Sequence, residues 1–300
     1  MQSPLSSPDD RRSGPRRSAR PARVARALSA VALAVAMSGG AVAIAGPAAA
    51  DEIGQAPTAA NINGNGSFSV GSSAVSAVGT SFGGGTAYYP TTAGRYPVIA
   101  ISPGYTATWS SISWIGPRLA SWGFVVVGIN TQNRFSLSPD SRGTQLIAAL
   151  NWAVASSPSA VRSRADGGRR GVAGHSMGGG GALRALAQSS NIQAGVPIAP
   201  WHTDKTWPEI TEPVTVVGGE NDTVADEDQH AIVFYNSANG PKTYVEVNNG
   251  GHFFPQSTNS TLSRALVTHF KRWLNQDARF TPFSCAFTGT DVSDFRSTVC

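Results

Sequence analysis

One short segment, GVAGHSMGGGGALRALAQ at residues 171–188, constrains the fold of this chain more than any other part of its sequence. A Val/Ala run typical of a strand leads through glycines into ALRALAQ, which favours a helix. A phosphate-binding loop would need Lys and then Ser or Thr after its last glycine, but Ala182 and Leu183 follow here. A flexible linker is not expected between a strand and a helix. The pattern instead predicts a sharp turn that carries Ser176 within a G-x-S-x-G match.

Such a turn holds its serine in an unfavourable backbone conformation at the end of a strand. Gly174 and Gly178 lack a Cβ atom, so neighbouring strands and the following helix can approach closely. G-x-S-x-G also arises by chance in chains rich in Gly and Ser. The strand-to-helix context makes the match specific, and we therefore predict Ser176 as a nucleophile.

A serine hydroxyl group needs a neighbouring base, which a carboxylate orients. In folds with this turn the chain order is Ser, acid and His, each after a strand. The apolar run at residues 213–217 precedes a loop with four acidic residues, and Asp222 lies in the loop proper. Glu220 is too near the strand end, whereas Asp226 and Asp228 suit the first turn of the next helix. Asp222 is the predicted acid, with an ordinary turn residue as the alternative.

The five histidines differ in their positions relative to the expected elements. His252 follows the strand-like TYVEV and the turn NNGG, and it precedes the last helix, so it is the predicted base. His230 and His269 are expected inside helices, and His202 is expected to pack or to lie at a rim. His175 is adjacent to the serine but is expected to point elsewhere. No HExxH, His-x-His or clustered Cys pattern occurs, so no catalytic metal is expected.

Acyl transfer needs two preorganised donors for the oxyanion that forms. We expect the backbone N–H groups of Met177 and of Tyr105, which lies in the loop SPGYT after a strand. The stretch 199–213 is too short to form a lid, so we predict an open groove. Several aromatic residues are expected near its rim, and the core is an equal alternative for Trp109. They are Tyr105, Trp109, Trp201, Phe253 and Phe254.

Strand-like and helix-like runs alternate along the chain, which predicts an α/β fold with a mostly parallel central sheet and helices on both faces. Strands are expected at 68–75, 86–89, 98–102, 124–129, 171–174, 194–198, 214–218 and 243–247. Helices are expected at 112–122, 140–156, 177–188, 226–237 and 261–275. No linker divides the rest, so we expect one catalytic domain at 66–300 after a flexible arm at 51–65.

The first fifty residues differ in composition from the rest of the chain. Seven arginines precede an Ala/Val/Leu run, and AAA at 48–50 offers a cleavage pattern, which predicts a secretory signal peptide at 1–50 and an extracellular protein. A membrane anchor is the alternative, but the run is short and interrupted by Ser and Gly. The chain has a net charge of +5, yet 16 basic and 16 acidic residues remain without this leader. Nothing in the remainder argues for binding to nucleic acid.

Longer segments also occur in a distinctive order. They include ISPGYTATWSSISWIGPRLASWGFVVVGINT, PDSRGTQLIAALNW, GHSMGGGGALR, IAPWHTDKTW, NDTVA, GGHFFP and the end RFTPFSC…FRSTVC. With these segments the chain resembles the actinobacterial cutinases and related polyester hydrolases, some of which cleave poly(ethylene terephthalate). The resemblance extends over about residues 60–300. It implies a secreted α/β-hydrolase without a lid domain that cleaves carboxylic ester bonds in short-chain esters and polyesters, insoluble ones included.

The resemblance also assigns residues. It places the nucleophile, acid and base on Ser176, Asp222 and His252, as the strand-end order does. It implies that Tyr105 and Met177 supply the oxyanion hole.

The same resemblance implies substrate contacts at Tyr105, Trp201 and Val224. It further implies a disulfide between Cys285 and Cys300, the pairing that two cysteines in an exported chain already favour.

The chain departs from the family pattern at two places. No cysteines are present for the second disulfide that some members carry beside the site. Calcium sites of some members fall on Glu220, Asn248 and an acid of the tail, and Asn at 248 lowers the negative charge, which argues against calcium.

Other functions stay open at this stage. A triacylglycerol lipase or an acyltransferase would use the same residues, and a non-catalytic surface-binding protein could share the scaffold. We expect no cofactor, no stable membrane insertion, no nucleic-acid partner and a monomer.

Overall fold

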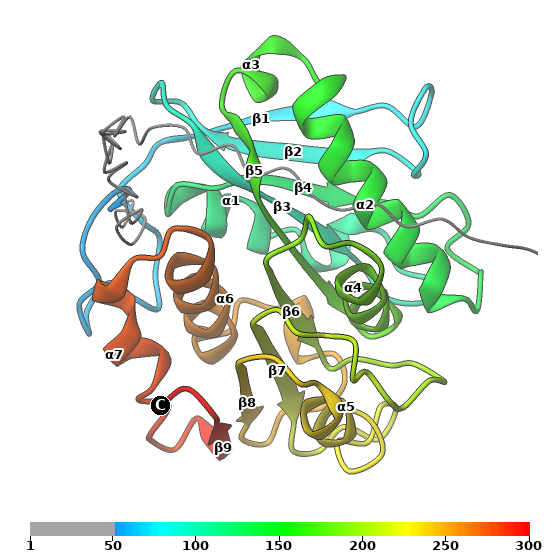
Figure 1. Cartoon of the computed structure of the whole chain (residues 1–300), viewed down its shortest axis with the longest axis vertical. Coiled ribbons are helices and arrows are strands. Elements are labelled where there is room, and N and C mark those ends of the chain that lie inside the picture. Colours follow the sequence, from blue (N-terminus) through cyan, green and yellow to red (C-terminus); the bar gives the residue numbers. More distant parts are fainter. Residues whose placement is uncertain (1–51) are drawn as a thin grey trace, which may run out of the picture. The chain divides into compact units, whose positions relative to one another are not determined.

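A computed structural model of this chain describes residues 52–300, and the predicted signal peptide at 1–50 lies outside the described part (Figure 1). The described residues contain one nine-stranded sheet with the order β1-β2-β4-β3-β5-β6-β7-β8-β9. Strands pair in parallel from β4 to β8, whereas β1, β2 and β9 pair antiparallel. The predicted α/β class with a mostly parallel sheet is therefore confirmed.

The strands have the following bounds. They are β1 Val70–Val75, β2 Gly85–Pro90, β3 Tyr96–Ser102, β4 Val125–Ile129, β5 Ala165–His175, β6 Ala194–Ile198, β7 Val214–Gly219, β8 Lys242–Val247 and β9 Val292–Ser297. The helices are α1 Ile115–Ser121, α2 Pro139–Ala155, α3 Ser159–Arg162, α4 Met177–Gln188, α5 Ala231–Ser237, α6 Ser260–Leu274 and α7 Thr281–Ser284. Short 3-10 helices are η1 Trp109–Ile112, η2 Phe254–Gln256 and η3 Ala278–Phe280.

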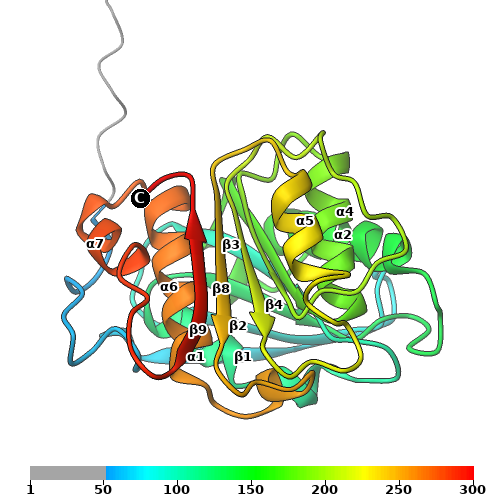
Figure 2. The ribbon, with the colours of Figure 1, turned by 90° about the horizontal axis from the view of Figure 1, so that it is seen from below.

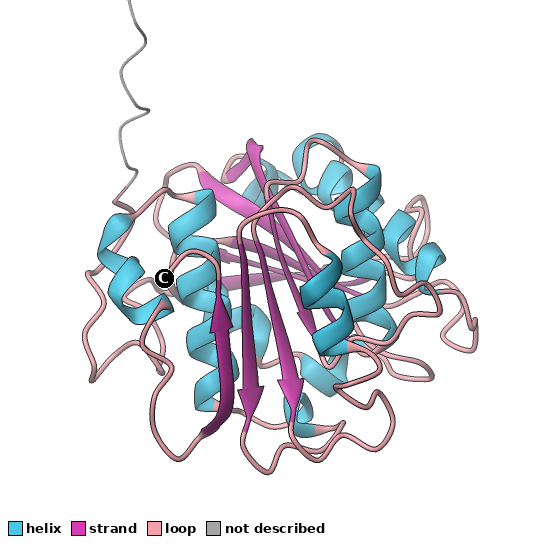
Figure 3. Ribbon diagram, turned by 60° about the horizontal axis from the view of Figure 1, so that its bottom comes forward, coloured by secondary structure: helices cyan, strands magenta, loops and turns pink. Residues whose placement is uncertain are grey.

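Helices cover both faces of the sheet, which explains why the central strands are continuously apolar and buried. Helices α2, α4 and α5 pack on one face, and α1 and α6 pack on the other (Figure 2). The strands fan out between these two layers (Figure 3). Because the parallel strands run in one direction, their carboxyl ends meet at one edge, where their loops can meet.

Local sequence determines where the two longest helices begin. Ser138 caps α2, because its side chain accepts a hydrogen bond from the N–H of Ser141, and Pro139 occupies the first turn. Asn259 caps α6 in the same way through the N–H of Leu262. These caps satisfy amide groups that have no partner inside the helix.

Several elements differ from the sequence-based expectation, and the short helices α3 and α7 were not predicted. Strand β9 was not predicted, because its segment VSDFRS is polar and half-buried at the sheet edge. Strand β5 starts at Ala165, six residues before the expected position, within the polar run ADGGRR. Helix α5 begins at Ala231, because His230 has the non-helical angles φ −132° and ψ −82°. Asp226 and Asp228 therefore lie in the preceding turn, and the prediction that they start the helix is wrong.

The segment 52–65, predicted as an arm, contacts the helices. Ile62 is buried against the α1 side of the sheet, and Trp122 Nε1 donates a hydrogen bond to the carbonyl oxygen of Gly64. Lys271 Nζ donates to the carbonyl oxygen of Ile53. The boundary between arm and domain at residue 66 stays a prediction.

Candidate active site

Ser176 lies at the turn between β5 and α4, as the glycine pattern predicts. Its backbone has φ 57° and ψ −123°, a conformation that is strained for any residue with a side chain. A Cβ atom at Gly174 would lie 2.2 Å from the carbonyl oxygen of Gly178, and one at Gly178 would lie 2.2 Å from that of Ser102. Both positions therefore require glycine, because the chain segments around the turn are in close contact.

Three predicted residues come together at the carboxyl edge of the sheet. His252 Nε2 lies 2.9 Å from Ser176 Oγ, and His252 Nδ1 lies 2.8 Å from Asp222 Oδ2. The three residues follow strands β5, β7 and β8, and their exposed fractions are 8%, 4% and 5%. We call Ser176, Asp222 and His252 the buried triad. Its geometry allows the imidazole to take a proton from the serine hydroxyl while the carboxylate holds the ring.

Asp222 is held as a carboxylate. Its Oδ1 accepts hydrogen bonds from the N–H groups of Val224 and Ala225, at 2.9 Å and 2.8 Å. Burial alone would raise the pKa of Asp222, but the hydrogen bonds from His252 and the two amides outweigh burial and hold its pKa below the usual value. The negative charge opposite the imidazole is thus maintained in a buried place.

His175 contacts the triad, a contact that was not predicted. Its Nε2 lies 2.8 Å from the carbonyl oxygen of His252, to which it donates a hydrogen bond. Burial, with the nearby positive charge that His252 can carry, lowers the pKa of His175 to about 4, so the ring is neutral at neutral pH. The two histidines are 77 positions apart, and no local pattern links them.

The loop after β3 lies beside the serine. A Cβ atom at Gly104 would lie 2.9 Å from Ser176 Cβ, so the backbone of this loop contacts the nucleophile. Tyr105 follows Gly104, and Thr106 has φ 60° with its N–H bonded to the carbonyl oxygen of Arg134 at 2.9 Å. The loop is therefore held next to Ser176, and the oxyanion role of the Tyr105 and Met177 amides stays a prediction.

An open groove of about 440 Å³ is lined by Ser176 and His252 of the triad. Among its lining residues Tyr105, Val224 and Phe253 are 43%, 53% and 60% exposed, and we call these three the groove rim. The lining also includes residues that were not predicted, namely Thr106, Ala107, Thr108, Ser111 and Gln256.

The remaining predicted aromatic residues lie in different environments. Trp201 is half-buried, stacks on His230 with ring centroids 5.9 Å apart, and donates its backbone N–H to the carbonyl oxygen of Ser176. Phe254 is half-buried and packs against the core. Trp109 is only 4% exposed and belongs to the core, which is one of the two placements expected for it.

The residues considered for calcium make other contacts. Glu220 accepts a hydrogen bond from the N–H of Asn249, and Asn248 donates its side-chain amide to the carbonyl oxygen of Thr290. Asn248 Oδ1 accepts a hydrogen bond from the side-chain amide of Asn249, so an oxygen atom is still present at this position. The expected absence of calcium stays a prediction. Between residues 52 and 300 no group of three or more His, Cys, Asp or Glu side chains is arranged to hold a metal ion.

The predicted disulfide is present. Cys285 and Cys300 are joined with their Cα atoms 5.4 Å apart. The bond ties the segment after α7 to the end of the chain that follows β9.

Comparisons with known proteins agree with this architecture. A family model described as PET hydrolase-like matches residues 45–300. Cutinase est1 of Thermobifida alba is 45% identical over 241 residues, which cover 78% of this chain and 81% of that protein. A bis(hydroxyethyl) terephthalate hydrolase of Streptomyces coelicolor is 45% identical over 240 residues, covering 78% and 76%. A cutinase of Thermobifida fusca is 42% identical over 295 residues, covering 95% and 97%.

The mostly parallel sheet and the serine at its strand-to-helix turn, taken with these matches, define an α/β-hydrolase. More narrowly, the chain belongs to the PET hydrolase-like family. In the part of the chain that the structure describes, no helix is both long enough and apolar enough to cross a membrane.

Proposed function

We propose that this protein is a carboxylic ester hydrolase that works through an acyl-enzyme on Ser176. The observation that carries the proposal is the hydrogen-bonded chain from Asp222 through His252 to Ser176, beside an open groove. The family match and relatives named as cutinases and as a bis(hydroxyethyl) terephthalate hydrolase support ester and polyester substrates.

In the proposed reaction, Ser176 Oγ attacks the carbonyl carbon of the ester while His252 Nε2 takes the hydroxyl proton. The electron pair of the C=O bond moves to oxygen, and the amides of Tyr105 and Met177 donate hydrogen bonds to this oxyanion. The imidazolium gives its proton to the leaving alcohol as the C–O bond breaks. Water, deprotonated by the same imidazole, then attacks the acyl carbon, the bond to Ser176 Oγ breaks to release the acid, and the imidazolium returns the proton to Oγ. Asp222 orients the ring and stabilises its positive charge throughout.

The exposed rim supports substrates that are bulky or chain-like, including insoluble polyesters. Tyr105, Trp201 and Val224 are the proposed contacts for the acyl part of the ester. A lipase or an acyltransferase would use the same buried triad. Hydrolysis should therefore be compared for short esters, polyester film and triolein, with and without a competing alcohol. Free acid formed from short esters and polyester film, with little product from triolein, supports the polyester hydrolase.

We further propose how the chain is processed and organised. Residues 1–50 act as a secretory signal peptide, which makes the mature protein extracellular, and residues 66–300 form one catalytic domain. The enzyme acts as a monomer, and it needs no cofactor because the triad supplies the nucleophile, base and acid.

The test is Ser176→Ala with p-nitrophenyl butyrate. We expect kcat to fall about 10⁴-fold or more, because the attacking oxygen is removed. A fluorophosphonate probe should label the unaltered protein and fail to label this variant. Ser190→Ala, on the exposed turn after α4, is the matched control and should keep full activity. Wild-type hydrolysis or labelling by Ser176→Ala contradicts the proposal.

A further inference from the structure

A second hollow adjoins the groove of the buried triad. It has a volume of about 290 Å³ and is lined by Ala107, Thr108 and residues 130–135 of the loop between β4 and α2. Ala107 and Thr108 also line the groove that holds Ser176. The two depressions therefore share a wall, and we call the second one the adjoining hollow.

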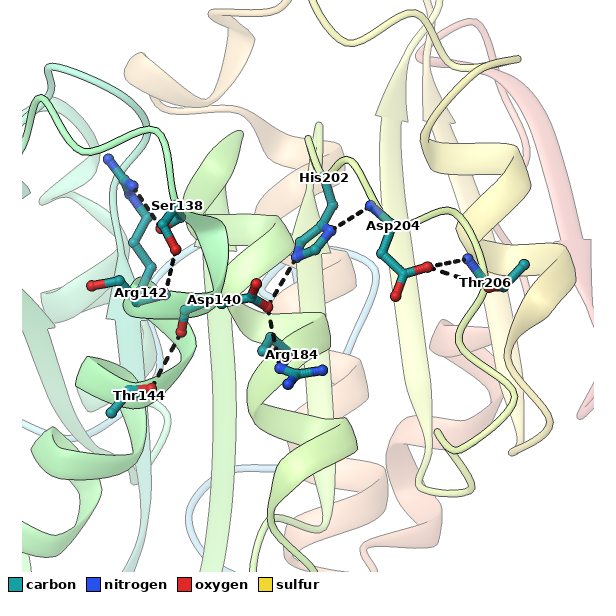
Figure 4. A network of polar contacts seen from close by, with 9 residues as sticks. Ser138, Asp140, Arg142, Thr144, Arg184, His202, Asp204 and Thr206 are labelled. Atoms are coloured by element: carbon teal, nitrogen blue, oxygen red, sulfur yellow. Dashed lines mark hydrogen bonds and ion pairs between the residues drawn. The ribbon is translucent and has the colours of Figure 1, made fainter.

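A buried arginine holds the loop that lines the adjoining hollow. Arg142 on α2 is only 1% exposed, and its guanidinium donates to the carbonyl oxygens of Ser136, Ser138 and Arg134 at 2.9, 3.2 and 3.4 Å. Figure 4 shows Arg142 beside Ser138 at the start of α2. The carbonyl oxygen of Arg134 also accepts the N–H of Thr106, which lines the catalytic groove. The wall of the hollow and the wall of the groove are thus tied together.

The lining of the adjoining hollow combines apolar and hydrogen-bonding groups. Phe135 is 58% exposed, and the Arg134 guanidinium lies over its ring at 4.9 Å from the centroid. Gln132 is exposed in the same wall and brings amide donors. An exposed aromatic ring on such a loop is a ready contact surface, because the backbone that carries it is already held in place.

We propose that the adjoining hollow binds the neighbouring repeat unit of a polyester chain while Ser176 attacks the ester in the groove. A polyester alternates apolar segments with ester carbonyls at a fixed interval. The Phe135 ring covers the apolar segment, and the donors of Gln132 and Arg134 reach the carbonyl of the next ester. The inference rests on the proposed ester hydrolysis and names the part of the protein that favours a chain over a single ester.

The test compares Phe135→Ala with the unaltered enzyme on linear 6-hydroxyhexanoate oligoesters with one, two and three ester bonds. We expect kcat/KM for two and three bonds to fall roughly three- to tenfold, the range expected for an aromatic contact at an interface. The rate on p-nitrophenyl butyrate should stay within about twofold, because a single short ester does not reach the hollow. Val78→Ala is the control, since Val78 is 89% exposed and lies outside the lining of both depressions.

The outcomes separate the two proposals. If Phe135→Ala lowers all substrates equally, or leaves the dependence on chain length unchanged, the adjoining hollow is not a repeat-unit site. The adjoining hollow is also not a repeat-unit site if Val78→Ala reproduces the effect, because the oligoester would then bind non-specifically to exposed apolar side chains. If the unaltered enzyme cleaves p-nitrophenyl butyrate but shows no preference for longer oligoesters, the repeat-unit site is contradicted and the proposed ester hydrolysis is retained. If it cleaves no ester, the proposed function itself fails.

Discussion

The buried triad and the groove rim lie within one site but are held in different ways. Members of the triad are at most 8% exposed, and hydrogen bonds of 2.8 to 2.9 Å join them. Members of the rim are 43% to 60% exposed. One part is held by its surroundings on every side, and the other leaves much of each side chain to solvent.

The difference follows from what each part has to do. Proton transfer and attack need atoms placed within about 0.5 Å, which only packed and hydrogen-bonded surroundings provide. A groove for bulky chains instead needs exposed apolar surface, which the substrate can cover when it binds. Changes in the triad should therefore act on kcat, and changes at the rim should act on KM.

Asp222→Asn should give the largest effect. We expect kcat for p-nitrophenyl butyrate to fall about 10⁴-fold, because the amide leaves the imidazole in the wrong tautomer. The melting temperature should change little, since Oδ1 can still accept from the two amides of Val224 and Ala225. Asp226→Asn, in the turn before α5, is the matched control and should retain wild-type kcat. If kcat of Asp222→Asn falls only slightly, the expected distinction between a triad that determines kcat and a rim that determines KM is wrong.

The next largest effect should be a loss of protein stability in acid. Burial lowers the pKa of His175 to about 4 and that of His269 to about 3, whereas the unfolded chain takes up these protons near the ordinary value of 6.5. The unfolded state binds more protons as the pH falls from 6.5 towards 4, so stability should decrease across this window. Each histidine should account for roughly 3 kcal/mol of unfolding free energy. Asp222 adds a loss only below its ordinary value, because its pKa is lowered.

Urea unfolding at pH 7 and at pH 4.5 measures this effect. His269→Asn keeps a partner for the Thr215 hydroxyl, which lies 2.9 Å from His269 Nδ1, and it removes one titrating group. The stability difference between the two pH values should therefore be smaller in this variant than in the unaltered protein. An equal difference would show that other groups cause the acid sensitivity.

The triad could be predicted because it depends on local and topological rules. A serine in a glycine-rich strand-to-helix turn, an aspartate after one strand and a histidine after the next meet wherever parallel strands end at the same edge. The structure places Ser176, Asp222 and His252 within hydrogen-bond distance. Each member of the triad could thus be predicted from sequence, because the strand and the turn around it mark its position.

What could not be predicted depends on contacts between distant segments. His175 donates a hydrogen bond to the carbonyl oxygen of His252, and Arg142 donates to three carbonyl oxygens of the preceding loop. No sequence pattern around either residue indicates these partners. Strand β9 is polar and half-buried, so no apolar alternation marks it. Trp109 was expected at the rim as an equal alternative to the core, because side-chain type alone does not say which way a loop residue faces.

Val224→Thr should have the smallest effect and gives the sharpest test of the rim. The substitution exchanges a methyl group for a hydroxyl group with little change in shape, and the backbone N–H that supports Asp222 at 2.9 Å remains. We expect KM for p-nitrophenyl butyrate to rise about two- to fourfold, since covering one less methyl group forfeits about 0.8 kcal/mol at most. The value of kcat should stay within about twofold, as stopped-flow and steady-state kinetics can establish. A tenfold loss of kcat would mean that the rim side chain belongs to the chemistry, because nothing else in the substitution alters the groups that transfer protons.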